Sequence, residues 1–303
     1  MPITHAMPPL RSLQVFEAAA RNGNFTAAGD ELGITQSGVS RQVSDLEAVL
    51  GVALFIRNGA RLKITPAGER LAVQLADVLA RARTAVADAR RSDQVVTLSM
   101  LPSVATRWFA PRLGEFLAVN PEIDLRITAS RHLVDFAAEA VDAAIRYSPA
   151  PQGDLLAVKL GVEIILPVCS PEYARDHDLK RAADLSHVTL LCGDLPEDWS
   201  AWFEAAGIGT VLPVGPRLGD DGAILQAAVE HQGVALGRSL LVAEDIAAGR
   251  LVAPFDVFLE ASYAYWFVQP GNVASTPATE AVKAWLMDQF SLQQEAVGQL
   301  FGL

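Results

Sequence analysis

Apolar residues recur at intervals of three and four along the first 50 residues, the spacing of one buried face of an α-helix. This pattern predicts helices over about 10–21, 25–32 and 36–50, with Gly33 supplying the turn before the third. Thr35 lies where the third helix requires an N-cap. The buried stripe of that helix is expected to comprise Val39, Val43, Leu46 and Leu50.

The opposite face of the third helix carries short hydrogen-bonding side chains and one guanidinium, a mixture suited to base edges and phosphates in a major groove. An amphipathic helix with an ordinary solvated face has a similar composition, so the neighbouring residues decide between the two interpretations. The candidate DNA-reading residues are Thr35, Gln36, Ser37, Ser40 and Arg41.

A β-hairpin is predicted directly after this helix, because two short strand-like runs flank Asn58-Gly59, a dipeptide that favours a tight turn. The hairpin is basic, and its candidate phosphate-binding residues are Arg57, Arg61 and Lys63. Basic residues on an exposed hairpin can also be plain surface charge. Their position beside the candidate DNA-reading helix favours the DNA-binding interpretation.

Thr65 and Pro66 are typical of a helix start, and no strong helix breaker follows until residue 91. A helix of about 25 residues would be a rod of roughly 38 Å, too long to be buried by one small domain. Its apolar spacing matches the seam of a two-stranded coiled coil, so we expect a second subunit to cover it. The predicted seam residues are Leu71, Leu75, Val78, Ala82, Ala85 and Ala89.

From Val95 onward, short apolar runs alternate with helical stretches, which predicts an α/β fold with a mostly parallel sheet covered by helices. Ligands of such folds bind at the carboxyl ends of strands. The polar residues there offer hydroxyls, a guanidinium for a carboxylate and an acid for an ammonium, although each could simply serve a turn or a helix cap. The candidate effector-binding residues are Pro102, Ser103, Thr128, Ser130, Arg146, Tyr147, Asp221 and Tyr263.

Charge is distributed unevenly along the 303 residues, whose net charge is -11. Residues 1–91 contain eleven basic against eight acidic residues, whereas the remaining residues contain thirteen against twenty-seven. Because the basic excess coincides with the predicted helix-turn-helix, an acidic chain remains compatible with DNA binding through that part.

The sequence lacks the common catalytic, nucleotide-binding and metal-binding motifs, so we predict neither an enzyme nor a cofactor. Its five histidines are scattered, and Cys169 and Cys192 each end an apolar run, as inert buried thiols do. The first residues show no secretory signal, and no apolar run is long enough to span a bilayer. We therefore predict a cytoplasmic location.

The run FTAAGDELGITQSGVSRQVSDLEAVLGVALFIRNGARLKITPAGERL resembles the winged helix-turn-helix of LysR-type transcriptional regulators. The later segment LPSVATRWFAPRL is similar to the glycine-cleavage-activator branch of that family. The resemblance implies three parts: a DNA-binding domain (1–65), a dimerising linker helix (66–91) and an effector-binding domain (92–303) of periplasmic-binding-protein type. The last divides into subdomain I, about 92–162 and 268–303, and subdomain II, about 163–267.

The resemblance also implies a homodimer or homotetramer bound to a pseudo-palindromic operator in double-stranded DNA, with half-sites one helical turn apart. RNA polymerase is a further candidate partner. We predict a sequence-specific transcriptional regulator modulated by a small-molecule effector, a small carboxylate or an amino-acid-like ligand. Two alternatives stay open: a regulator that senses oxidants through its thiols, and a small-molecule binding protein without regulatory DNA binding.

Overall fold

The computed structural model describes residues 7–58, 61–88, 92–151, 153–194, 196–209 and 214–302. The chain divides into two compact units. The N-terminal unit comprises Met1–Arg90 and the short segment Ala137–Ala140, and the C-terminal unit comprises Arg91–Phe136 and Val141–Leu303.

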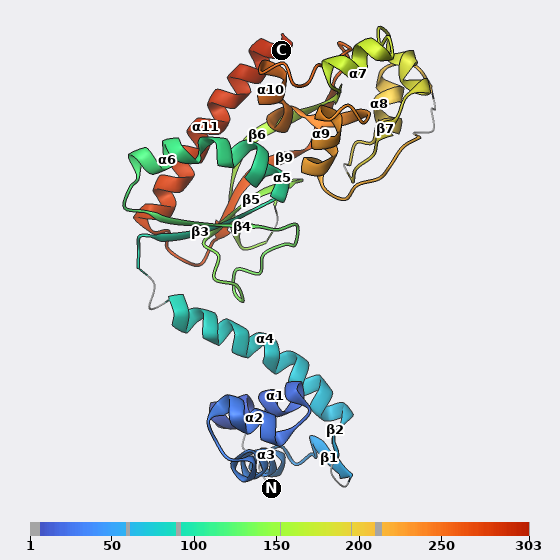
Figure 1. Cartoon of the computed structure of the whole chain (residues 1–303). Coiled ribbons are helices and arrows are strands. Elements are labelled where there is room, and N and C mark those ends of the chain that lie inside the picture. The colour runs from blue at the N-terminus through green and yellow to red at the C-terminus, as the bar shows by residue number, and fades with distance from the viewer. Residues whose placement is uncertain are drawn as a thin grey trace. The chain divides into compact units, whose positions relative to one another are not determined.

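Three helices form the centre of the N-terminal unit: α1 (Leu10–Asn22), α2 (Phe25–Leu32) and α3 (Gln36–Leu50) (Figure 1). The predicted stripe of α3 is buried in the core at Val39, Val43 and Leu46. Leu50 is the exception, because it is the last residue of the helix and is 38% exposed. The buried stripe fixes which side of α3 remains available to a partner.

The turn between α2 and α3 follows the predicted chemistry. Gly33 adopts a left-handed conformation with φ of 65°, which glycine reaches without the steric cost of a Cβ atom. Thr35 caps α3, and its hydroxyl oxygen accepts a hydrogen bond from the Gly38 amide at 3.1 Å. These two residues set the start and direction of α3.

Strands β1 (Phe55–Asn58) and β2 (Arg61–Ile64) form the predicted antiparallel hairpin, which we call the wing. Gly59, which we predicted in its turn, lies outside the described residues. One oxygen of Glu47 on α3 accepts hydrogen bonds from the amides of Leu54 and Phe55 at 2.7 and 3.0 Å. This carboxylate ties the wing to α3.

Helix α4 (Pro66–Asp88) follows the wing, and its first turns pack on the core of the N-terminal unit. Leu79, further along the helix, is also buried. Leu75 is 7% exposed and belongs to that core, whereas Val78 is 49% exposed. Ala82 and Ala85 are also exposed, and Ala89 lies outside the described residues. Within the described residues, the predicted seam is therefore exposed at Val78, Ala82 and Ala85.

The C-terminal unit is built on one seven-stranded sheet with the order β4-β3-β5-β9-β6-β8-β7 (Figure 1). Three of its strand pairings are parallel and three are antiparallel, so the prediction of a mostly parallel sheet was wrong. The physical reason is that the long strands β6 and β9 run antiparallel to their neighbours and to each other. The strands are β3 (Val95–Met100), β4 (Asp124–Ala129), β5 (Ala143–Ser148), β6 (Leu155–Val168), β7 (Leu190–Leu191), β8 (Val234–Arg238) and β9 (Leu259–Pro270).

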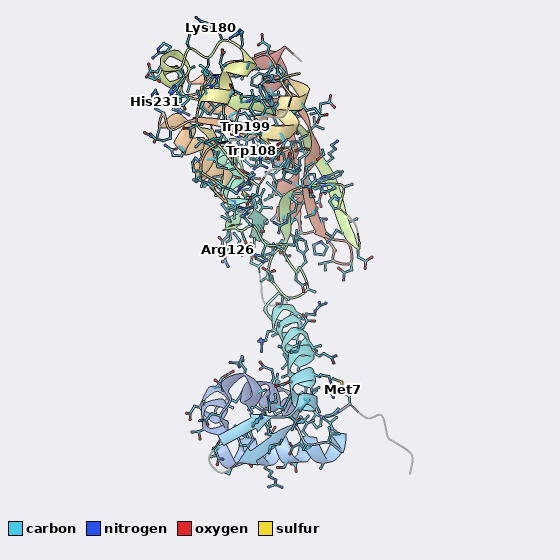
Figure 2. The ribbon with its side chains drawn as sticks, turned by 90° about the vertical axis from the view of Figure 1, so that its right-hand side faces the viewer. Met7, Trp108, Arg126, Lys180, Trp199 and His231 are labelled. Atoms are coloured by element: carbon cyan, nitrogen blue, oxygen red, sulfur yellow. The ribbon has the colours of Figure 1, made fainter. Side chains whose placement is uncertain are left out.

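Helices cover this sheet and enclose two buried clusters. Trp108 belongs to one cluster and Trp199 to the other, and both lie inside the C-terminal unit whereas Lys180 lies at its surface (Figure 2). Phe116 of α6 contacts Trp285 of α11 with ring centroids 5.2 Å apart. The helical segments are α5 (Pro102–Val104), η1 (Ala105–Phe109), η2 (Ala110–Arg112), α6 (Leu113–Val119), α7 (Pro171–Asp176), η3 (Ala182–His187), α8 (Trp199–Ala205), α9 (Asp221–Val229), α10 (Ser239–Ala247) and α11 (Pro277–Phe301).

The packing of α3 predicts the effect of a core deletion. Leu46→Ala should lower the free energy of unfolding of the N-terminal unit by about 3 kcal/mol, because it leaves a cavity at a side chain that is 1% exposed. The control is Val49→Ala on the same helix, 61% exposed, which should change stability by less than about 0.5 kcal/mol. Urea unfolding at fixed protein concentration measures both, and equal losses would contradict this packing.

Candidate functional site

The candidate DNA-reading residues lie at the N-cap and in the first two turns of α3. Thr35, Gln36, Ser37 and Arg41 are exposed, and Ser40 is half-buried. The hydroxyls of Thr35 and Ser37 lie 3.0 Å apart, so the N-cap also steadies the first turn of this face. A set of exposed hydroxyl, amide and guanidinium groups on a capped helix is suited to donate to and accept from base edges.

The wing adds positive charge beside this helix. Lys63 is exposed on β2. Arg57 lies on β1 and Arg61 lies on β2, but the structure describes only the backbone of these two residues. An exposed ammonium on a hairpin that is fixed to α3 by Glu47 is suited to hold a phosphate.

A cleft of about 350 Å³ opens in the C-terminal unit, a size within the usual range for small-molecule sites. Five of the eight residues predicted to bind the effector line it, together with residues that the sequence did not single out. The predicted ones are Pro102, Ser103, Tyr147, Asp221 and Tyr263, and Asp220 beside Asp221 lines it as well. The additional ones include Arg131, Asp194 and Arg238.

Arg238 ends strand β8 and places its guanidinium, 2% exposed, against the cleft. Its Nη2 donates to the Asp221 carboxylate at 2.5 Å and to the Ser103 hydroxyl at 3.3 Å. Nη1 has no hydrogen-bond partner among the described residues. A buried guanidinium that retains a donor is the chemistry expected of a carboxylate-binding site.

Charged and aromatic neighbours keep Arg238 cationic. Burial alone would lower the pKa of the guanidinium, but the surrounding Tyr265, Asp221 and Glu163 raise it above its usual value. The guanidinium carbon lies 4.5 Å from the centre of the Tyr147 ring, a cation–π contact. The positive charge is therefore held permanently at this point of the cleft.

Glu163 lies on strand β6, which pairs with the strand that carries Arg238, and it is 2% exposed. Its carboxylate accepts hydrogen bonds from the Ser239 hydroxyl at 2.7 Å and the Leu240 amide at 3.2 Å. Burial raises the pKa of the Glu163 carboxyl to about 7, against the opposing effects of the Arg238 charge and the Ser239 hydroxyl. Glu163 thus anchors the junction at which β8 ends and α10 begins.

Three tyrosines form an aromatic wall beside the guanidinium. The Tyr147 ring lies 5.5 Å from that of Tyr263 and 5.0 Å from that of Tyr265. Tyr263 lines the cleft, whereas Tyr265 is 1% exposed and packs against Phe290, as two-residue alternation along one strand face allowed. Burial raises the pKa of the Tyr147 hydroxyl, which stays neutral.

Three predicted effector residues do not line the described cleft. Arg146 is buried, and because side chains alternate along β5 it points to the face opposite Tyr147. Thr128 is exposed on β4. The Ser130 hydroxyl lies 2.5 Å from the His132 ring nitrogen, a contact within its own turn. Arg131 and Arg238 supply guanidinium groups to the cleft instead.

Arg107 supports the segment that carries Ser103. Its guanidinium contacts the Asp245 carboxylate at 2.5 Å and donates to the carbonyl of Gly222 at 3.3 Å. Asp245 also accepts from Arg250 at 2.6 Å. The helical segment after β3 is therefore bonded to both α9 and α10, which fixes one wall of the cleft against another.

Both cysteines are free thiols inside the C-terminal unit, with Cys169 fully buried and Cys192 7% exposed. Burial raises the pKa of Cys169 to about 12 and also raises that of Cys192, so neither is readily ionised to the reactive thiolate. No group of three or more metal-ligating side chains occurs within the described ranges. None of the helices in the described part of the chain has the length and apolarity that a membrane span requires.

Comparison with known proteins covers both units. Residues 10–69 match the family described as "Bacterial regulatory helix-turn-helix protein, lysR family", and residues 89–291 match the "LysR substrate binding domain". The glycine cleavage system transcriptional activator of Escherichia coli (strain K12) is 36% identical over 293 residues, covering 95% of this chain and 96% of the relative.

Solved structures agree with this assignment. The effector domain of the regulator AmpR of Pseudomonas aeruginosa has a TM-score of 0.60 at 32% identity and covers 68% of this chain and 98% of that one. CrgA of Neisseria meningitidis, a LysR-type regulator, shares the fold with a TM-score of 0.57 at 23% identity and covers 92% and 98%. The chain therefore belongs to the LysR family and is a transcriptional regulator with an effector-binding domain, not an enzyme.

Proposed function

We propose that this regulator binds a specific DNA sequence through α3 and the wing, and that a small carboxylate or amino-acid-like effector in the cleft modulates its activity. The observation that carries the effector proposal is the buried guanidinium of Arg238, whose Nη1 has no partner in the described structure. An anionic oxygen supplied by a ligand would satisfy it.

The other charges around the cleft support a small ligand with both signs of charge. Arg131 and Arg238 are cationic, whereas Asp194, Asp220 and Asp221 are anionic. Asp220 caps α9 through the Ala223 amide, and Arg131 lies 3.5 Å from Asp194. A zwitterion would meet complementary groups here, whereas an apolar ligand would displace water from these charges without offering them a partner.

The division into subdomains I and II at about residues 162 and 267 would fall within β6 and β9, the two long strands that join the halves of the unit. Their pairing is interrupted by register shifts between Lys159 and Gly161 and between Val162 and Ile164. Such irregularities bend strands locally, so ligand closure would rotate one subdomain about these points.

We further propose that α4 forms a homodimer, alone or within a tetramer, that places two copies of α3 on successive turns of DNA. The exposed apolar seam at Val78 supports this proposal. The operator would then be pseudo-palindromic. A regulator of this kind acts where the bacterial DNA lies, in the cytoplasm, and a contact with RNA polymerase would transmit its effect.

Arg238 should determine ligand binding. In a thermal-shift screen of the full chain against short carboxylates and amino acids, a ligand at a hundredfold excess over Kd should stabilise the native protein by about 2.7 kcal/mol. Arg238→Gln should abolish the shift and Ser103→Ala should reduce it. Arg126→Gln, an exposed arginine paired with Asp124, is the control and should retain it. Stabilisation that survives Arg238→Gln would refute this site.

Arg41 should contribute directly to DNA recognition. Binding of the full chain to a sequence selected from random duplex DNA should weaken by about 1–3 kcal/mol in Arg41→Ala if the guanidinium reads a base. Loss on all sequences alike would assign it to phosphate instead. Arg175→Ala is the matched control, because the Arg175 side chain on α7 is exposed. Unchanged operator affinity in Arg41→Ala would show that α3 presents another face.

The linker should dimerise through the seam of α4. Val78→Glu should increase the dissociation constant of the dimer by placing a charge in an apolar contact. Val73→Glu is the control, because Val73 is 75% exposed and lies on the opposite face of the same helix. Sedimentation equilibrium measures both, and an equal effect of the two variants would place the interface elsewhere.

A further inference from the structure

A second, smaller cavity of about 30 Å³ lies beside the cleft. Asp221 lines both, so the two spaces share a wall. The small cavity is also lined by Glu197, Trp199 and Gly193. Because a cavity of roughly 10–15 Å³ is enough to hold one water, this cavity has room for a compact polar group such as an ammonium.

Glu197 contributes a carboxylate with only one oxygen used. Its Oε1 accepts a hydrogen bond from the Ser262 amide at 2.6 Å, which ties the loop before α8 to strand β9. Its Oε2 is fully buried and has no hydrogen-bond partner among the described residues. A buried anionic oxygen without a donor is costly, so this position favours a donor or a cation from outside the chain.

Asp221 lines the same cavity. Its Oδ2 is held by Arg238, and its Oδ1 lies 3.6 Å from the point that a Cβ atom at Gly193 would occupy. Such a Cβ atom would also approach Ile224 Cδ1 to 2.8 Å. Glycine at position 193 therefore keeps the cavity wall beside Asp221 free of side-chain atoms.

Arg217 also lines this cavity, but its guanidinium is largely exposed to solvent and lies 3.8 Å from the Asp194 carboxylate. Its Nη1 donates to the Gly193 carbonyl at 2.9 Å, and its side chain is 68% exposed. Asp198 is also occupied, because its Oδ1 accepts from the amides of Ser200 and Ala201 at the start of α8. The unpaired oxygen of Glu197 remains the group that can recognise a ligand.

We infer that Glu197 makes the cleft selective for ligands that carry an ammonium group as well as a carboxylate. The inference rests on the proposed effector site and deepens it. The carboxylate of the ligand would bind Arg238 and Ser103, and its ammonium would enter the small cavity between Glu197 and Asp221. The ligand class is then a short amino acid, and a simple carboxylate of the same length is discriminated against.

The test compares matched ligands on the full chain by isothermal titration calorimetry. The probes are alanine against propionate and serine against 3-hydroxypropionate, with both enantiomers of each amino acid. Wild type should bind at least one amino acid at least about tenfold more tightly than its deaminated partner, the factor expected for a hydrogen bond to a charged group. This comparison needs no variant.

The variant Glu197→Gln tests whether Glu197 causes the preference for amino acids. The amide oxygen of glutamine can still accept from Ser262, so the melting temperature without ligand should stay close to that of wild type. Affinity for the amino acid should fall by about tenfold or more, whereas affinity for its deaminated partner should stay within about threefold. Glu172→Gln on α7, whose side chain is 61% exposed, is the control and should change neither.

The outcomes distinguish a failure of the Glu197 contact from a failure of the carboxylate site at Arg238. Equal affinities for both members of every pair in wild type, or an equal loss for both in Glu197→Gln, would overturn the role of Glu197 and leave the carboxylate site standing. No binding of any probe to wild type would overturn the amino-acid class itself. Binding that does not depend on Arg238 would overturn the proposed cleft instead.

Discussion

The C-terminal unit is organised around one buried cation. Arg238 is 2% exposed, and removing a guanidinium from water is costly unless anions and hydrogen-bond acceptors surround it. Asp221 contacts it directly, and Glu163 raises its pKa from behind. Because Asp221 begins α9, Glu163 lies on β6 and Arg238 ends β8, the charge requirement holds three separate elements in one arrangement.

The same requirement shapes the cleft. Tyr147 stacks on the guanidinium and Ser103 accepts from it, so residues of β5 and α5 are drawn to the same point. Arg107 then bonds the helical segment after β3 to α9 and α10. The walls are thus fixed by charge as well as by the apolar clusters, and a ligand that changed the environment of Arg238 would act on all of them.

The sequence predicted the N-terminal unit closely because its structure is local. Gly33, Thr35 and the stripe around Val43 act on residues a few positions away, and helical periodicity captures such relations. The same rule failed at Leu50, where the helix ends beyond its core. The spacing of apolar residues identifies which face of a helix is buried. It does not show how far along the helix the rest of the core covers that face.

The cleft was only partly predictable, for a different reason. Both Arg146 and Arg238 end apolar strand runs, and no local signal distinguishes them. The choice depends on which face each side chain takes and on which strands are neighbours, and the position of β9 between β5 and β6 is a long-range property. Glu197, which we propose contacts the ligand, lies in a loop and so has no periodicity by which the sequence could have identified it.

The carboxylate of Glu47 gives the N-terminal unit a mechanical property. By accepting from two amides at the entry to the wing, it prevents the hairpin from tilting freely against α3. If α3 and the wing both contact DNA as proposed, the distance between them is therefore nearly constant. A duplex whose groove width does not match this distance would have to deform to bind. The energy of that deformation would discriminate among sequences at base pairs that neither element touches.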